Sequence, residues 1–160
     1  MSLQLYQRLP TRARRQVVRT IAPSYTVGAM CFIERDDGDL LLVRLAYRKH
    51  WGVPGGLVQR GEDSADAARR EVFEEVGLAI DLIGEPAVVV EPEPQRVDVI
   101  YKARPVAGTD PASAAPQSPE IVEVGWFARD SLPELQHETV TALLTLERKA
   151  VNDVRAGEGG

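Results

Sequence analysis

Cysteine is almost absent from this sequence, which has only Cys31 among its 160 residues. A single cysteine excludes an internal disulfide framework and is typical of a protein in the reducing cytosol. No apolar run approaches the roughly 20 residues of a membrane-spanning helix. The N-terminus also lacks the apolar core and cleavage site of a secretory signal. We therefore expect a cytoplasmic protein with no membrane span.

Acidic residues are missing from residues 1–20, which contain five arginines. The rest of the chain has 14 basic and 24 acidic residues, and its net charge is −10. Nucleic-acid binding calls for a basic footprint, so we expect no nucleic-acid partner. A polyphosphate ligand would need bound cations to offset repulsion by this acidic body.

Residues 1–22 form a basic segment that we predict to be helical, with a break at Pro10. Two interpretations remain open for it. Its apolar side chains pack on the domain or on a second subunit, which would make a homodimer, or the segment lies on an anionic membrane surface. The short length of the segment and the break at Pro10 favour packing.

Alternating apolar residues and β-branched residues indicate strands along the rest of the chain. We predict strands at residues 26–33, 40–45, 57–58, 97–103 and 120–127, and one within 79–90. Asp37-Gly38 predicts a hairpin between the first two strands. Helices are expected at 64–76, capped by Asp63 or Ser64 and stopped by Gly77, and at 139–151.

These elements predict one domain at residues 23–152, followed by a disordered tail at 153–160. Residues 104–119 are rich in Pro, Ala and Ser and indicate a long surface loop. Strands interrupted by single helices indicate an α/β architecture, with a mixed sheet and helices on both faces.

The stretch RREVFEEVG, residues 69–77, places three carboxylates close together on the predicted helix: Glu71, Glu74 and Glu75. Each like-charge pair at this spacing costs a helix roughly 0.2–0.5 kcal/mol. One interpretation is a solvated acidic face that nearby arginines balance. The other is a site for a hard cation, since clustered carboxylates bind Mg²⁺ or Mn²⁺ through oxygen. The repulsion and the flanking residues favour the cation site.

A longer pattern frames this helix. Gly56 is followed by Glu62 after five positions, and then by Arg70-Glu71, an apolar residue, Glu74-Glu75, Gly77 and an apolar residue. The pattern resembles the Nudix box, the signature of the Nudix hydrolase family, with no departure from it. The resemblance implies an α/β/α sandwich with a mixed sheet and a loop–helix–loop metal site. It also implies Mg²⁺-dependent hydrolysis of a nucleoside diphosphate linked to another moiety.

By this resemblance the three glutamates would be metal ligands, joined by the carbonyl of Gly56, and Mn²⁺ is a second candidate metal. Arg70 would orient a carboxylate, and Glu62 would support the loop or a second metal. Cations that bridge pyrophosphate oxygens neutralise developing charge and lower the pKa of a bound water. A carboxylate then takes the proton of that water.

The general base stays open between a glutamate of the box and a glutamate elsewhere, where the candidates are Glu120, Glu123 and Glu93. Each of these three could equally be a solvated charge at a strand edge. Glu120 is our candidate because it precedes Trp126-Phe127 near the long loop.

Candidate substrate contacts gather in the segment before Pro54-Gly55-Gly56: Arg44, Tyr47, Arg48 and Trp51. The arginines could bind phosphate, and Tyr47 or Trp51 could stack on a base. Trp51 could instead be a core anchor under the loop, which we favour. The expected partner is a small nucleotide of the nucleotide-sugar, ADP-ribose or nucleoside triphosphate type.

Three other functions compete with hydrolysis of a small nucleotide. A non-catalytic nucleotide-sensing module would be expected to lose carboxylates of the box, and all of them are present here. An isomerase acting on a prenyl diphosphate would need a reactive cysteine near the metal, whereas Cys31 lies within a predicted buried strand, where packing is its expected role. RNA decapping is disfavoured by the acidic body.

Overall fold

The computed structural model describes residues 10–13 and 22–157. Most of the basic segment predicted at residues 1–22 therefore lies outside the described residues. None of the described helices has the length and apolar character that crossing a membrane requires.

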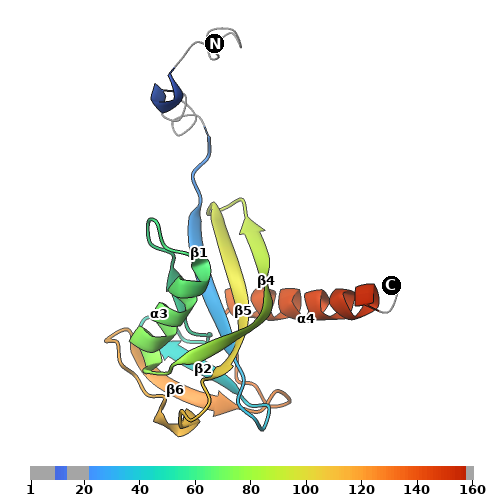
Figure 1. The fold of residues 1–160 in the computed structure, drawn as a ribbon. Helices are drawn as coiled ribbons and strands as arrows, with labels where there is room; N and C mark the ends of the chain where they lie inside the picture. Colours follow the sequence, from blue (N-terminus) through green and yellow to red (C-terminus); the bar gives the residue numbers. More distant parts are fainter. Residues whose placement is uncertain (1–9, 14–21, 158–160) are drawn as a thin grey trace.

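Strands of the described chain form two sheets (Figure 1). The larger sheet has the order β3-β1-β5-β4, in which β1 and β5 are parallel and the other neighbours are antiparallel. The smaller sheet pairs β2 with β6. The strands are β1 (Thr26–Ile33), β2 (Leu40–Leu45), β3 (Gly55–Leu57), β4 (Ile80–Glu91), β5 (Arg96–Pro105) and β6 (Ile121–Phe127).

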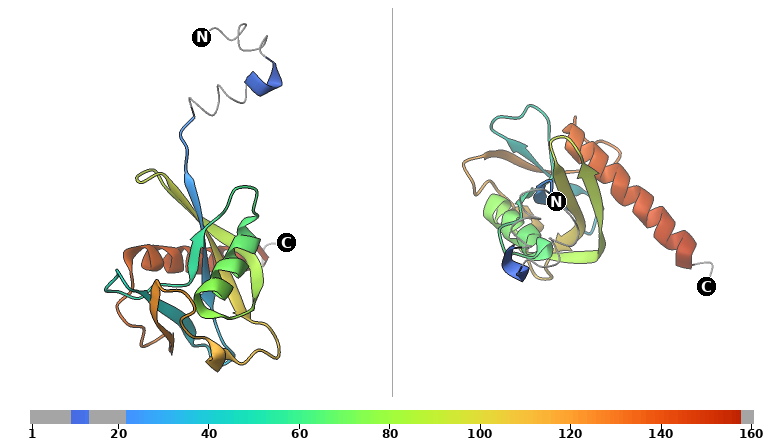
Figure 2. Two further views of the ribbon diagram at one scale, coloured as in Figure 1. Left: turned by 90° about the vertical axis from the view of Figure 1, so that its left-hand side faces the viewer. Right: turned by 90° about the horizontal axis from the view of Figure 1, so that it is seen from above.

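The two long helices, α3 (Ser64–Val76) and α4 (His137–Gly157), lie on opposite sides of the larger sheet (Figure 2). The side chains of β1 point alternately toward α3 and toward α4, because successive side chains of a strand point to opposite faces of the sheet. Cys31 and Ile33 belong to the core cluster that includes α3, whereas Met30 and Phe32 pack with residues of α4. The predicted α/β architecture with helices on both faces is confirmed.

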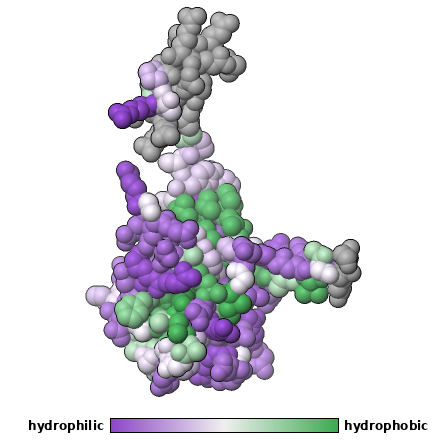
Figure 3. Space-filling model, in the orientation of Figure 1, coloured by the Kyte–Doolittle hydropathy of each residue, from purple (hydrophilic) through white to green (hydrophobic). Residues whose placement is uncertain are grey.

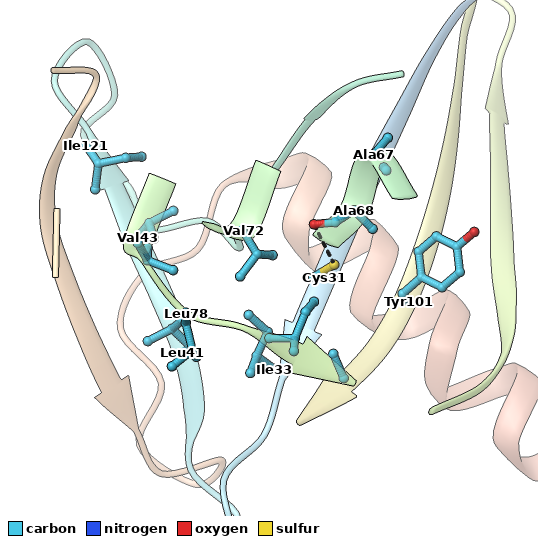
Figure 4. Packing of buried hydrophobic residues seen from close by; sticks show 14 residues of the cluster. Cys31, Ile33, Leu41, Val43, Ala67, Ala68, Val72, Leu78, Tyr101 and Ile121 are labelled. Carbon is cyan, nitrogen blue, oxygen red and sulfur yellow. Dashed lines mark hydrogen bonds between the residues drawn. The ribbon is translucent and has the colours of Figure 1, made fainter. Parts of the chain in front are cut away.

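Cys31 lies in the middle of the core beneath α3 (Figure 4). Its side chain is fully buried, and its Sγ lies 3.9 Å from the carbonyl oxygen of Ala68. Burial, with a further contribution from Glu75, raises the pKa of the Cys31 thiol to about 12. A buried thiol with this pKa is not a nucleophile, so the packing role expected for Cys31 matches its environment.

The predicted hairpin between residues 26–33 and 40–45 is wrong. The turn forms, but only one bridge, between Glu34 and Leu40, joins the two segments. Strands β3 and β5 occupy the two edges of β1, so β2 pairs with β6 instead. A turn signal specifies a local reversal of the chain and does not specify which strands pair.

The tail predicted to be disordered at residues 153–160 is instead helical as far as Gly157, because α4 continues into it. An i,i+4 ion pair of 2.6 Å between Lys149 and Asp153 spans the predicted helix end and supports this extension. Residues 158–160 lie outside the described chain. Figure 1 shows the last turns of α4 projecting past the edge of the sheet.

The long loop at residues 104–119 is anchored to the domain. It contains a short 3₁₀ helix, η1 (Pro111–Ser113), and Trp126 Nε1 donates a hydrogen bond of 3.0 Å to the Pro111 carbonyl. The backbone N–H groups of Ala115 and Gln117 donate to carbonyls in the last turn of α3. The loop therefore supplies partners for the helix end.

Polar and apolar residues are separated on the surface seen in Figure 3. Polar side chains cover much of α3, with the exposed Phe73 as an exception, whereas apolar ones gather on the sheet above it. The exposed apolar residues of these strands include Val27, Val88 and Val90.

Candidate active site

Helix α3 begins and ends where the sequence indicates. Asp63 is the N-cap and accepts a hydrogen bond of 2.8 Å from the backbone N–H of Ala65. Gly77 ends the helix in the left-handed conformation, with φ of 71°. The stripe buried against the sheet comprises Ala67, Ala68, Val72 and Val76. The acidic residues therefore occupy the side of α3 that remains accessible.

Arg70 lies at the centre of the acidic face. Its guanidinium donates to both Glu62 oxygens at 2.7 and 2.9 Å, and to Glu71 at 2.7 Å. It also contacts Glu74 at 3.1 Å and the Leu57 carbonyl at 3.1 Å. These bonds hold the pKa of Glu62 down to about 2, chiefly through Arg70 and then through the Gln59 N–H. Arg70 thus offsets much of the repulsion among the carboxylates and ties α3 to β3.

Glu75 is held differently, because no arginine contacts it among the described residues. Its Oε2 accepts a hydrogen bond of 3.0 Å from the Gly55 N–H. Burial raises the pKa of Glu75 to about 7, and the nearby carboxylates of Glu71, Glu120 and Glu74 raise it further, although the Gly55 hydrogen bond lowers it. A half-buried carboxyl group among other carboxylates is a strong acceptor for a cation.

Gly56 is required by the close approach of β3 to α3. A Cβ atom at this position would overlap the carboxylate of Glu71. Glycine therefore lets the backbone of β3 lie directly against the carboxylate. This contact brings Gly56 and Glu71 together, as the metal-site prediction requires.

The donor set fits a hard cation in its chemistry, since it consists of carboxylate and backbone oxygens. Within the described residues, however, no group of three or more His, Cys, Asp or Glu side chains converges into a preformed metal site. Arg70 holds Glu71 and Glu74 instead, and Glu74 remains 58% exposed. Both interpretations of the acidic helix thus have support: an arginine balances two carboxylates, and Glu75 is left for a cation.

A cleft of about 500 Å³ lies beside β3, between α3 and the start of α4. Six of the predicted site residues line it: Tyr47, Arg48, Gly56, Glu71, Glu75 and Glu120. A larger groove of about 690 Å³ lies along the middle of α4, between Leu143 and Val151, and no predicted site residue lines it. The smaller cleft is therefore the candidate active site.

Arg44 and Trp51 do not belong to the described lining of this cleft. Arg44 lies on β2 and forms a two-pronged ion pair with Glu123 on β6, at 3.0 and 2.6 Å. Trp51 packs edge-to-face on Phe127, with ring centroids 4.9 Å apart. We therefore leave Arg44 and Trp51 out of the substrate contacts, and the anchoring role favoured for Trp51 matches its packing.

The ion pair with Arg44 also accounts for Glu123, whose pKa it lowers. Glu93 lies in the turn between β4 and β5 and is not among the described residues that line the cleft. Of the three candidate bases outside the box, Glu120 alone lines the cleft. Its role as a base stays a prediction.

The family model of the NUDIX domain matches residues 24–145. The chain belongs to the NUDIX family. The match covers all six strands, α3 and η1, and it includes α4 as far as residue 145. The family resemblance therefore extends well beyond the box.

Known NUDIX proteins resemble the chain in sequence and in structure. It is 27% identical to a MutT-like protein of Streptomyces ambofaciens over 119 residues, which is 74% of each chain. It is 32% identical to the 8-oxo-dGDP phosphatase NUDT18 of Homo sapiens over 130 residues, which is 78% of this chain and 36% of that protein. The chain thus spans about a third of NUDT18.

A solved MutT NUDIX hydrolase from Burkholderia pseudomallei superposes with a TM-score of 0.63 and is 30% identical. The superposition covers 77% of this chain and 98% of that one. The α/β architecture is therefore that of NUDIX hydrolases, and the chain is a NUDIX hydrolase.

Several residues of the NUDIX cleft were not predicted from the sequence. Arg96 reaches it from β5, Gln136 lies directly before α4, and Glu138 and Thr139 lie in the first turn of α4. None of them belongs to the box or to a recognisable local motif. Arg96 is a charged residue directly before the strand predicted at 97–103, and this position is a sequence signal that could have marked it.

Proposed function

We propose that this NUDIX hydrolase cleaves the pyrophosphate bond of a nucleoside diphosphate linked to another moiety, with Mg²⁺ or Mn²⁺ as cofactor. The observation that carries the proposal is the half-buried Glu75, which shares one cleft with Glu71 and Glu120. Charge of one sign gathered in a concave site is costly unless a ligand offsets it. A cation bound there offsets it and also allows a polyanionic substrate to enter.

Each residue of the site has its own role in this proposal. Glu71, Glu75 and the Gly56 carbonyl would hold the cation, and Glu74 would be a further ligand. The chemistry that Mg²⁺ would supply here is charge neutralisation on the pyrophosphate and a lower pKa for a water molecule. Arg70 fixes the orientation of Glu71 through their 2.7 Å bond. Glu120 accepts the proton released from the attacking water.

Substrate recognition is assigned to residues at the mouth of the cleft. Tyr47 is 67% exposed there and presents its ring for stacking on a base. Arg48 lines the same cleft and supplies a positive charge for phosphate. The expected substrates are nucleotide sugars, ADP-ribose and nucleoside triphosphates. Because the similar protein NUDT18 is an 8-oxo-dGDP phosphatase, we add oxidised purine nucleotides to them. A cytoplasmic location and a homodimer stay predictions.

A substrate panel tests the proposal. Purified protein is incubated with ADP-ribose, nucleotide sugars, dinucleoside polyphosphates, canonical and oxidised nucleoside di- and triphosphates and a capped RNA, each with and without Mg²⁺. We expect Glu75→Gln to lower turnover of the preferred substrate by about 100-fold or more, because it removes a ligand charge. Glu74→Gln is expected to lower it as well, with the fold intact by circular dichroism.

Glu147→Gln serves as the matched control, since Glu147 is a helical glutamate outside the cleft. Wild-type turnover by Glu75→Gln in Mg²⁺ would overturn the assignment of the metal site.

The second candidate function is a nucleotide-sensing module without catalysis. The ion pairs of Arg70 with Glu71 and Glu74 favour it, because they satisfy two of the proposed ligands without a metal. It predicts nucleotide binding with no product from any substrate of the panel.

A further inference from the structure

One arginine of the cleft is held in a way that leaves part of its guanidinium available. Arg96 opens β5, and its Nε donates to both oxygens of Asp98 at 2.8 and 2.9 Å. Among the described residues, none accepts a hydrogen bond from the two terminal nitrogens of Arg96. These nitrogens carry four of the five N–H donors of a guanidinium.

Asp98 is a buried anchor for this arginine. Its side chain is 7% exposed, whereas that of Arg96 is 36% exposed. Asp98 also borders a narrow gap between the sheet and α4, beside Thr141 and Ala142. A buried carboxylate needs a charged partner, so the pair holds the base of the Arg96 side chain in one place.

Gly28 of β1 makes room for the pair. Gly28 is the neighbour of Asp98 in the parallel register of β1 and β5. A Cβ at Gly28 would overlap Asp98 Oδ1 and lie 3.0 Å from Arg96 Nη2. The terminal end of the guanidinium therefore lies over the backbone of β1, next to β3 and the cleft.

Acidic residues outnumber basic ones in the cleft, so a phosphate entering it requires a positively charged group. Its described acidic lining residues are Glu71, Glu75, Glu120 and Glu138, and its described basic ones are Arg48 and Arg96. Arg48 lies 3.6 Å from Glu138, a longer contact than the bonds between Arg96 and Asp98. Arg96 is thus the positive charge of this cleft that the protein holds most firmly.

Arg96 approaches from the side of the sheet opposite α3. Asp98 shares its gap with α4, whereas Gly56 lies against Glu71 of α3. A pyrophosphate lying across the edge strand β3 would meet carboxylates and their cation on one side and a guanidinium on the other. The planar fork of arginine suits two phosphate oxygens at once.

We propose that Arg96 binds a phosphate group of the substrate and that Asp98 is the positioning residue that aims it. This inference rests on the proposed function and adds a phosphate contact outside the box. Arg96 supplies binding and orientation, so its loss raises KM more than it lowers kcat.

The test measures affinity as well as turnover. Calorimetry with inorganic pyrophosphate in millimolar Mg²⁺ is performed on the wild type, Arg96→Gln and Arg104→Gln. Arg104 lies on the same strand and lines the other groove, so it is the matched control. We expect Arg96→Gln to weaken pyrophosphate binding by about tenfold or more, and Arg104→Gln to leave it unchanged. The KM of the preferred substrate is expected to rise in parallel.

A double variant separates phosphate binding from a merely structural role. Arg96→Gln leaves Asp98 buried without its partner and is expected to lower Tm. Adding Asp98→Asn removes that charge, so Tm recovers while pyrophosphate affinity stays low. Recovery of affinity in the double variant would show that Arg96 acts only by neutralising Asp98 and would overturn the inference.

Failure of the inference and failure of the proposed function give different results. Normal pyrophosphate affinity and normal KM in Arg96→Gln would overturn the inference. Hydrolysis of a panel substrate by the wild type would still support the proposed function in that case. A wild type that binds no pyrophosphate would also overturn it. If the wild type hydrolyses nothing in the panel yet loses pyrophosphate binding through Arg96→Gln, the phosphate contact stands and the hydrolytic function fails.

Discussion

Glu75 and Glu62 show how differently the structure treats two glutamates of one motif. Glu62 accepts bonds from Arg70 and from the Gln59 N–H, and its pKa falls to about 2. Glu75 is half-buried among other carboxylates, and its pKa rises to about 7. The sequence pattern names both residues, but their environments give one a structural tie and leave the other available for a cation.

At the residue scale, we expect Glu75→Gln to stabilise the metal-free protein, and we expect the gain to grow with pH. Because the pKa of Glu75 is raised in the folded state, the native protein binds more protons than the unfolded chain between about pH 4.5 and about pH 7. Wild-type stability therefore falls relative to the variant across this range, by about 3 kcal/mol in all. Urea unfolding in EDTA at several pH values measures the difference.

An equal difference in the free energy of unfolding between wild type and Glu75→Gln at low and at high pH would contradict this prediction. Mg²⁺ provides an internal check, since a cation that binds the native wild type raises its Tm. The variant lacks that ligand charge and is expected to respond less.

At the scale of elements, the site depends on how closely β3 approaches α3. Arg70 ties the helix to the Leu57 carbonyl and to Glu62, and Gly55 donates to Glu75. The loop between the two elements is thereby fixed at both ends. Residues of the Nudix box that are separated in the sequence lie in contact here. Gly56 matters because the carboxylate of Glu71 packs directly on the backbone of β3.

We expect Gly56→Ala to keep the fold and to lower turnover by about tenfold or more, since a displaced ligand weakens metal binding. The added Cβ overlaps the Glu71 carboxylate and pushes it away from β3. Gly157→Ala, where nothing lies near the new Cβ, is the control. Steady-state kinetics over a range of Mg²⁺ concentrations and a thermal melt measure the effect. Unchanged kinetics in Gly56→Ala would mean that the carboxylate is not held against the strand.

The elements also show where local sequence signals are insufficient. The caps of α3 are local, because Asp63 and Gly77 act within a few residues of the helix ends. The sequence predicted Gly77 and narrowed the N-cap to Asp63 or Ser64. The pairing of β2 is not local. Its partner β6 comes about 80 residues later in the chain, and their ion pair joins Arg44 to Glu123, 79 positions apart.

At the scale of the whole molecule, charge is divided between a basic N-terminal segment and an acidic body. The body has a net charge of −10 once residues 1–20 are set aside. The cleft nevertheless contains both signs, with Arg48 and Arg96 facing several carboxylates. An acidic protein can therefore receive a polyphosphate at one place, where cations and two arginines lower the local repulsion.

We expect a chain that lacks residues 1–22 to hydrolyse the preferred substrate with unchanged kcat and KM. The reason is that the described residues lining the cleft lie between Met30 and Thr139. Kinetics of the full and shortened chains measure this. Loss of turnover with the fold intact would contradict it and would place the basic segment at the active site.

Light scattering and vesicle co-sedimentation of the same two chains address the remaining alternatives for residues 1–22. A dimer formed only by the full chain would support packing on a second subunit. Binding of only the full chain to anionic vesicles would support a membrane surface.

The sequence by itself determined the helix at 64–76, its caps, the carboxylates of its accessible side and the family to which the box belongs. These features depend on residues at most 22 positions apart, and the spacing of side chains along a helix is set by its own geometry. The tertiary structure alone decided that Arg70 ties α3 to the Leu57 carbonyl of β3, that Glu75 is half-buried without an arginine, and that Arg96, held by Asp98, reaches the cleft from another strand. Burial and charge pairing at these atoms depend on which distant segments pack together, and no local pattern of residues encodes that.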